Sequence, residues 1–261
     1  IGLAQDELDG VIYLKPMHKA LRMAIKARDT ADRIVAGQAQ FVPEYEEAQR
    51  GLRVALREVE NLPPALRLNI EEPGTDAKAR IEEVFAVWAE SSKLRPAAGQ
   101  HDPNHARLVE ALVRAIDGVG NSSRLILDPD LDTYYLMAFV IYQSPVLFSD
   151  LGQLRNIDPA DLPVSERLVR RARILGSMDV NKAAIRASMK VAFEHNSRAN
   201  DATLENSLTA PLEEFISALE SVKQSSTFSL SADRIGAFEE EEAFRQCRAT
   251  LDLGQALYGQ S

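Results

Sequence analysis

Residues 102–119 read DPNHARLVEALVRAIDGV and carry the pattern of a packed helix. Asp102 suits a helix N-cap, and Pro103 suits the first helical position, where its missing N–H costs nothing. Apolar residues then recur every three or four positions, at Leu108, Leu112, Val113, Ile116 and Val119. The stretch therefore predicts an amphipathic helix that begins at a capped Asp-Pro step.

Helical periodicity continues on both sides of this stretch, and no alternating strand of useful length interrupts it. Asp-Pro steps recur at Asp128-Pro129 and Asp158-Pro159, and we expect helices to begin there. The polar run QSST at residues 224–227 is expected to end a helix. The predicted helices cover 3–41 with a kink or an early boundary at Pro16, 43–62, 75–95, 102 onward, 129–156, 163–199, 201–223 and 231 onward.

Short connections between consecutive helices favour antiparallel neighbours that pack as bundles. We therefore expect an all-α chain with two stacked antiparallel four-helix bundles that share long helices. One bundle is expected to use mainly residues 30–126, and the other residues 1–30 and 127–261. The chain begins at Ile1 and both ends lie within helical pattern, so we expect a region cut between two longer helices.

Composition restricts the classes of function. Of 261 residues, 45% are hydrophobic and only 6% aromatic, a mixture that suits helix packing better than sheet packing. The net charge of −9 lacks the basic footprint of a nucleic-acid-binding protein and disfavours adhesion to anionic lipid. Cys247 is the single cysteine, so no disulfide can form within the chain.

Catalytic and metal-binding motifs are missing from the sequence. None of the four histidines follows a Glu by three positions, as a carboxylate-bridged metal centre in a helical bundle would need. Asp128, Asp130 and Asp132 have the alternate spacing of a calcium loop. Thr133 and Phe139 stand where such a loop needs Gly and Glu, which excludes it. We expect no enzymatic activity in this chain, no cofactor and no metal.

Residues 121–137, NSSRLILDPDLDTYYLM, gather three acids, two tyrosines and Arg124 at one helix junction. Asp128 as a cap and Pro129 as the first helical residue explain the local shape of this junction. Capping alone does not explain why so many polar and aromatic groups meet there. The junction is therefore a candidate binding site.

This segment resembles the LDPDxDxYYLM signature of the helical sensor regions of bacterial transmembrane histidine kinases and of some chemotaxis receptors. Residues 10–16, GVIYLKP, look like the stretch that follows the first membrane helix in that family. Residues 144–155 resemble the family's P…LGxLR continuation. Where the family often has His-Arg-Gly, this chain has Ala27-Arg28-Asp29, so only Arg28 matches. The resemblance is specific over residues 121–155 and loose over most of the chain.

The resemblance implies a ligand-sensing, periplasmic region of an inner-membrane sensor histidine kinase, held by flanking membrane helices. The receptor would act as a homodimer, and a bound small molecule or periplasmic partner protein would shift its helices. An anionic ligand would suit the guanidinium groups. The candidate contacts are Arg28, Arg124, Asp128, Asp130, Tyr134, Tyr135 and Arg155. The alternatives are the sensor region of a chemotaxis receptor, which shares the signature, and a helical protein-interaction scaffold.

Overall fold

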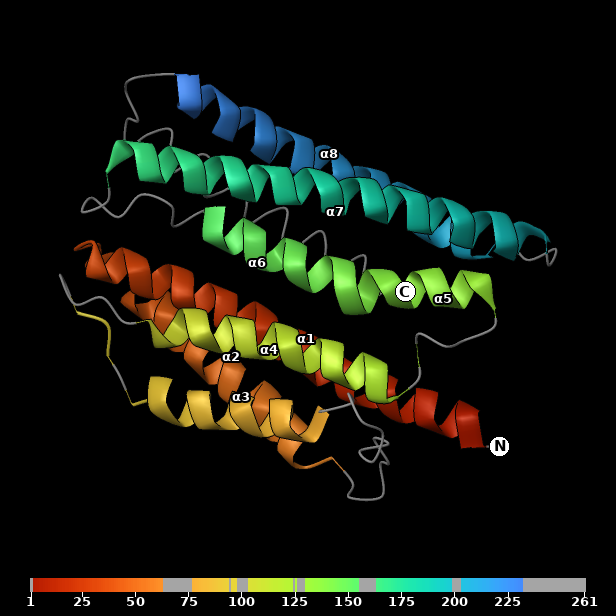
Figure 1. The fold of residues 1–261 in the computed structure, drawn as a ribbon. Coiled ribbons are helices and arrows are strands. Elements are labelled where there is room, and N and C mark those ends of the chain that lie inside the picture. Colours follow the sequence, from red (N-terminus) through yellow and green to blue (C-terminus); the bar gives the residue numbers. More distant parts are fainter. Residues whose placement is uncertain are drawn as a thin grey trace. The chain divides into compact units, whose positions relative to one another are not determined.

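The computed structural model shows helices and no strand over the residues that it describes, which confirms the predicted all-α class (Figure 1). The described residues are 2–62, 77–93, 95–97, 103–123, 125, 130–154, 163–198 and 203–231. The chain divides into two compact units, Ile1–Asp128 and Pro129–Ser261, called unit 1 and unit 2 below.

Unit 1 is built from α1 (Gly2–Val35), η1 (Ala39–Phe41), α2 (Val42–Glu60), α3 (Ala77–Ser91) and α4 (Asn104–Ser122). α1 packs against α2 and α4, and α3 packs against α4. Each fully buried aliphatic side chain in this core contributes about 1.5–3 kcal/mol to the stability of the fold. The largest are Leu14, Met17, Leu21, Ile25, Leu52, Leu108, Leu112 and Ile116.

The end of α1 is set by a glycine. Gly37 has a φ of +89°, a conformation that side-chain-bearing residues rarely adopt. The backbone N–H of Gln38 donates to the carbonyl of Arg33 at 2.9 Å, and that of Gly37 donates to Ile34 at 2.9 Å. These bonds satisfy the last carbonyls of the helix. The helix expected over 3–41 is therefore shorter, and it continues through Pro16 instead of ending there.

Unit 2 contains a continuous helical run of α5 (Leu131–Ala138), η3 (Phe139–Gln143) and α6 (Ser144–Leu154), followed by α7 (Val164–Arg198) and α8 (Thr203–Ser231). The run α5–η3–α6 packs against α7, and α8 packs against α7 as well. Phe148 of α6 and Phe215 of α8 meet edge to face, with ring centroids 6.5 Å apart. Other core residues are Phe139, Ile141, Leu147, Ile185 and Met189.

η3 is a turn of π-helix inside this run. Pro145 lies just after it and has no N–H to offer the carbonyl of Ile141, so the α-helical bonding pattern cannot continue unchanged. The hydroxyl of Ser144 donates to the carbonyl of Val140 at 3.3 Å. The helix widens instead of breaking, and the helix predicted over 129–156 is observed as one run over Leu131–Leu154, with positions 129, 155 and 156 of the prediction lying outside the described residues.

Two expectations need correction. Residues 1–30 were expected to join residues 127–261, but α1 lies wholly in unit 1, where it packs on α2 and α4. The boundary between the units falls between α4 and α5, so no described helix is shared. The run 224–227 was expected to end a helix, but α8 continues to Ser231. Gln and Ser disfavour a helix interior only slightly and, unlike Pro, remove no backbone hydrogen bond.

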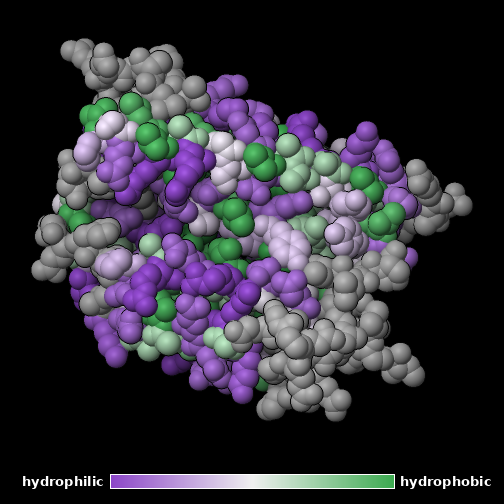
Figure 2. Space-filling model, viewed as in Figure 1, coloured by the Kyte–Doolittle hydropathy of each residue, from purple (hydrophilic) through white to green (hydrophobic). Residues whose placement is uncertain are grey.

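The surface carries no large apolar area on the face drawn in Figure 2, where hydrophobic residues form small patches among hydrophilic ones. Within the described part of the chain, none of the helices is both long and apolar enough to cross a membrane.

Candidate functional site

Within unit 2, the described part of the predicted junction begins with Asp130. This residue is exposed and precedes the first turn of α5. Its carbonyl accepts the backbone N–H of Tyr134 at 2.9 Å, and its side chain makes no cap hydrogen bond. Tyr134 and Tyr135 meet edge to face, with ring centroids 5.1 Å apart. Tyr134 is 36% exposed and Tyr135 is half-buried. The structure thus brings three of the predicted residues together at the start of α5, with an aromatic surface open to solvent.

Asn196, near the end of α7, ties this junction to the α7–α8 connection. Its side-chain amide donates to a carboxylate oxygen of Asp132 at 3.4 Å. Its amide oxygen accepts the backbone N–H of Leu204, the second residue of α8, at 3.3 Å. Asp132 also accepts the backbone N–H of Thr133 at 2.9 Å. One side chain therefore links the starts of α5 and α8 to the end of α7.

The other predicted contacts are Arg28, Arg124, Asp128 and Arg155. Arg28 is on α1 in unit 1 and only 6% exposed, so it is a core residue of that unit. Arg124, Asp128 and Arg155 lie outside the described residues. An anion site formed by Arg28, Arg124 and Arg155 remains a prediction.

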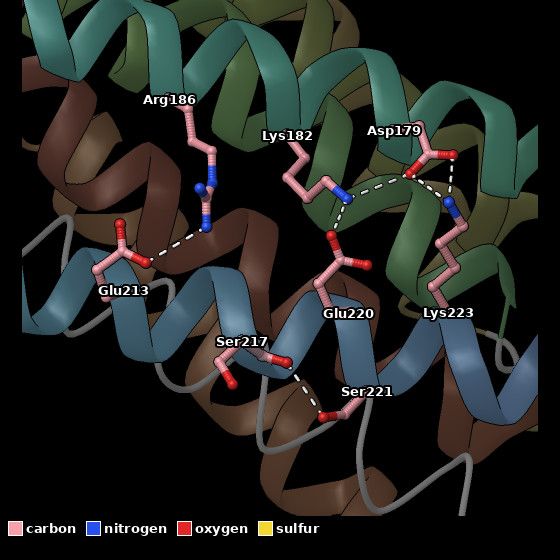
Figure 3. A network of polar contacts seen from close by, with 8 residues as sticks. All are labelled: Asp179, Lys182, Arg186, Glu213, Ser217, Glu220, Ser221 and Lys223. Carbon is pink, nitrogen blue, oxygen red and sulfur yellow. Dashed lines mark hydrogen bonds and ion pairs between the residues drawn. The ribbon is translucent and has the colours of Figure 1, made fainter.

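A ladder of ion pairs joins α7 and α8 (Figure 3). Lys223 of α8 donates to both carboxylate oxygens of Asp179 on α7, at 2.9 and 2.7 Å. One turn further along, Lys182 pairs with Glu220 and lies 3.4 Å from Asp179. Arg186 then pairs with Glu213 at 3.3 Å. The pairs follow an antiparallel order, because residue numbers rise along α7 as they fall along α8.

The charges of the ladder stabilise one another. The hydrogen bond from Lys223 lowers the pKa of Asp179, desolvation opposes this in part, and the hydrogen bond and charge of Lys182 lower the pKa further. Burial alone would lower the pKa of Lys182, but the hydrogen bond and charge of Glu220, with those of Asp179, raise it. Each exposed pair contributes only about 0.2–1 kcal/mol, so the ladder determines the register of the two helices more than the stability of unit 2.

A groove between α7 and α8 opens past Arg186, toward the Asn196 end of the helices. It has a volume of about 660 Å³. Phe193 and the buried Leu212 supply its apolar lining. The remaining lining residues are polar or charged: Arg186, Lys190, Glu194, Glu205, Thr209 and Glu213. Such a groove suits a small molecule with an apolar body and charged ends better than a purely apolar ligand.

Two further polar groups in unit 2 are buried. The hydroxyl of Ser177 donates to Asp150 at 2.6 Å, and Asp150 is only 8% exposed. Burial raises the pKa of Asp150, and the hydrogen bond from Ser177 and the charge of Arg173 offset this only in part. Gln143 of η3 donates to Ser188 of α7 at 2.8 Å. These contacts fix the run α5–η3–α6 against α7.

Sequence reasoning missed the ladder and the groove. The sequence did carry a signal for the ladder, because Asp179, Lys182 and Arg186 recur at helical spacing on α7 and charges that can pair with them recur on α8. Assigning the partners requires the register between the two helices, which spacing alone does not give. Among the described residues, no group of three His, Cys, Asp or Glu side chains could hold a metal ion. No family model, no curated protein and no solved structure matches the chain.

Proposed function

We propose that the chain is the ligand-sensing, extracytoplasmic region of a membrane-bound sensor histidine kinase. The observation that supports this most is residues 127–137, LDPDLDTYYLM, whose described part forms an exposed junction of Asp130 with Tyr134 and Tyr135. The resemblance of this segment to a sensor signature motivates the assignment. A sensor region of a chemotaxis receptor would use the same site with a different cytoplasmic output.

The ligand binds in the groove between α7 and α8 in this proposal. Asn196 connects the start of α5 to the end of the α7–α8 pair at which the groove opens. It does so through its hydrogen bonds to Asp132 and to the backbone of Leu204. A ligand that shifts α7 and α8 together there would strain the bond from Asn196 to Asp132. The start of α5 would then respond to occupancy of the groove, as a two-state sensor requires.

The ion-pair ladder makes α7 and α8 move as one body. Sliding α8 by three residues in one direction would place Lys223 beside Lys182, and in the other direction Glu220 beside Asp179. Either slip replaces an attraction with a repulsion of like charges. A ligand-induced shift of this hairpin is therefore transmitted along its length and is not lost by slippage.

The proposal is tested by reading the coding sequence outward by about 60 codons on each side. It predicts an apolar stretch of about 20 residues on both sides, the length needed to cross a bilayer, followed downstream by a kinase domain. Polar sequence on both sides would leave the helical interaction scaffold as the function to pursue.

A further inference from the structure

The first turns of α7 carry a surface unlike the rest of this acidic chain. Residues 163–173 contain four arginines, of which Arg170 and Arg173 are exposed, and a single acid, Glu166, whereas the whole chain has a net charge of −9. Three large aliphatic side chains are exposed among them, Val164 at 60%, Leu168 at 37% and Val169 at 68%. We call residues 164–173 the basic–apolar face.

This face is exposed around most of the helix circumference. Leu168 and Val164 are four residues apart and share one side, while Val169 and Arg173 share another. Both sides are open to solvent. A helix that is apolar on more than one side is normally covered by another element.

The end of α8 lies beside the basic–apolar face. The ladder places Lys223 opposite Asp179, and the same antiparallel register continued for eight residues brings Ser231, the last residue of α8, level with Arg171. Figure 1 shows the same relation, with the end of α8 at the start of α7. The 30 residues that follow Ser231 therefore leave α8 at this face.

The sequence after Ser231 has complementary chemistry. Residues 238–244 read FEEEEAF, with four consecutive carboxylates between two phenylalanines. The run begins seven residues after Ser231, enough for an extended chain to span about 23 Å. Basic and apolar groups on α7 thus lie within reach of acidic and apolar groups on the same chain.

We propose that residues 238–244 dock on the basic–apolar face of α7 in the same molecule. Glu239–Glu242 pair with Arg170 and Arg173, and Phe238 and Phe244 cover Val164, Leu168 and Val169. In the structure Arg170 pairs with Glu166 at 2.9 Å. On docking, it shares its guanidinium between Glu166 and the carboxylates of residues 239–242. The contact does not depend on the sensor proposal, and it anchors the C-terminal segment to unit 2.

Hydrogen–deuterium exchange of the full chain tests the contact. Val169→Glu adds a carboxylate to the docking face, and Val180→Glu is its matched control, because Val180 lies on the same helix and is 70% exposed. We expect amides 238–244 to be protected in the wild-type chain and in Val180→Glu. In Val169→Glu their exchange should accelerate about tenfold, the loss expected for a few partly exposed pairs. Equal exchange in both variants, or no protection in the wild-type chain, would overturn the proposal.

A charge exchange separates docking from loss of folding. Arg170→Glu with Arg173→Glu should accelerate exchange at 238–244, and adding Lys at positions 239–242 should restore protection. Arg50→Glu with Arg53→Glu, two exposed positions on α2, is the control and should have no effect. Failure of the lysine substitutions to restore protection in a folded variant would contradict the assigned pairing. Protection that rises with protein concentration, with a doubled mass in light scattering, would place the segment on a second copy and also overturn the proposal.

Discussion

Asn196 near the end of α7 donates a hydrogen bond to Asp132 at the start of α5, and accepts one from the backbone of Leu204 at the start of α8. In the sequence, Asn196 is 64 positions from Asp132 and 8 positions from Leu204. The polar contact joins three helices at the end of unit 2 where the groove and the tyrosine pair lie. The account of sensing depends on this connection more than on any single candidate ligand contact.

Asn196→Ala should loosen the starts of α5 and α8 together. Loss of two hydrogen bonds at a half-buried site is expected to cost about 1–2 kcal/mol of stability. Amide exchange at 131–136 should rise. Asn181→Ala is the control, because among the described residues the Asn181 side chain bonds within its own helix, at 3.0 Å to the carbonyl of Ser177 and 3.4 Å to its hydroxyl. Unchanged amide exchange at 131–136 in Asn196→Ala would show that the hydrogen bonds of Asn196 do not hold the start of α5 in place.

Asp179→Asn and Lys223→Gln should each destabilise unit 2 modestly, and the double variant should lose less than their sum. The pair is exposed by about 40% on both sides, so a coupling of about 0.5–1 kcal/mol is expected. The measurement is a double-mutant cycle from urea denaturation. Lys78→Gln with Glu82→Gln, a pair at 4.0 Å on α3, is the reference and should show weaker coupling. Additive effects at 179 and 223 would mean that the ladder does not hold the register.

Asp150→Asn should stabilise unit 2 at neutral pH. Burial raises the pKa of Asp150 above 3.8, so the folded state holds a proton more tightly than the unfolded state. Stability is then lost as pH rises above the ordinary Asp range, and is not lost at pH 3. The Asn variant removes this loss and keeps an acceptor for Ser177. Urea midpoints from pH 3 to pH 8 check the sign, and a destabilisation by Asn that grows as pH rises would show that Arg173 favours the ionised carboxylate over the buried neutral form.

Two glycine substitutions should have opposite effects. A Cβ on Gly10 would lie 2.4 Å from the Cβ of Ser123, so Gly10→Ala forces α1 away from the end of α4 and should cost about 1–3 kcal/mol. A Cβ on Gly176 meets nothing within 4 Å, so Gly176→Ala should stabilise α7 by about 0.5–1 kcal/mol. The midpoint of thermal unfolding of each variant, compared with that of the wild-type chain, measures both effects. A stable Gly10→Ala would show that α1 and α4 approach less closely than described.

Under the proposed function, Tyr134→Ala should change the response of the full-length protein with little effect on stability. Val146→Ala is a matched control in the same unit, because both side chains are 36% exposed. Autophosphorylation of the full-length protein in membranes, with and without periplasmic extract, measures the response. Equal responses of the two variants and the wild type would remove Tyr134 from the site.

Helix positions followed from apolar spacing and from breakers that act locally. α7 was expected over 163–199 and is observed over Val164–Arg198, because its connections contain strong breakers such as Pro163. The end of α8 was misjudged because Gln and Ser only weaken a helix, and packing on α7 decides. The membership of α1 in unit 1 depends on contacts such as that of Gly10 with Ser123, far apart in sequence.

The candidate site was predictable only in its local part. The tyrosine pair and Asp130 adjoin in sequence, so their proximity followed from one helix start. The link from Asp132 to Asn196 and the pairing of Asp179 with Lys223 both depend on how α7 packs against its neighbours. Spacing within one helix carries no information about that register.

The proposed function requires this region to lie outside the cytoplasm, between two membrane helices. The most direct measurement fuses the natural gene, from its start through Ser261, to alkaline phosphatase and, in parallel, to green fluorescent protein in a bacterial host. The account predicts active phosphatase and a dark fluorescent fusion, because phosphatase folds only outside the cytoplasm. A bright fluorescent fusion with inactive phosphatase would contradict the account.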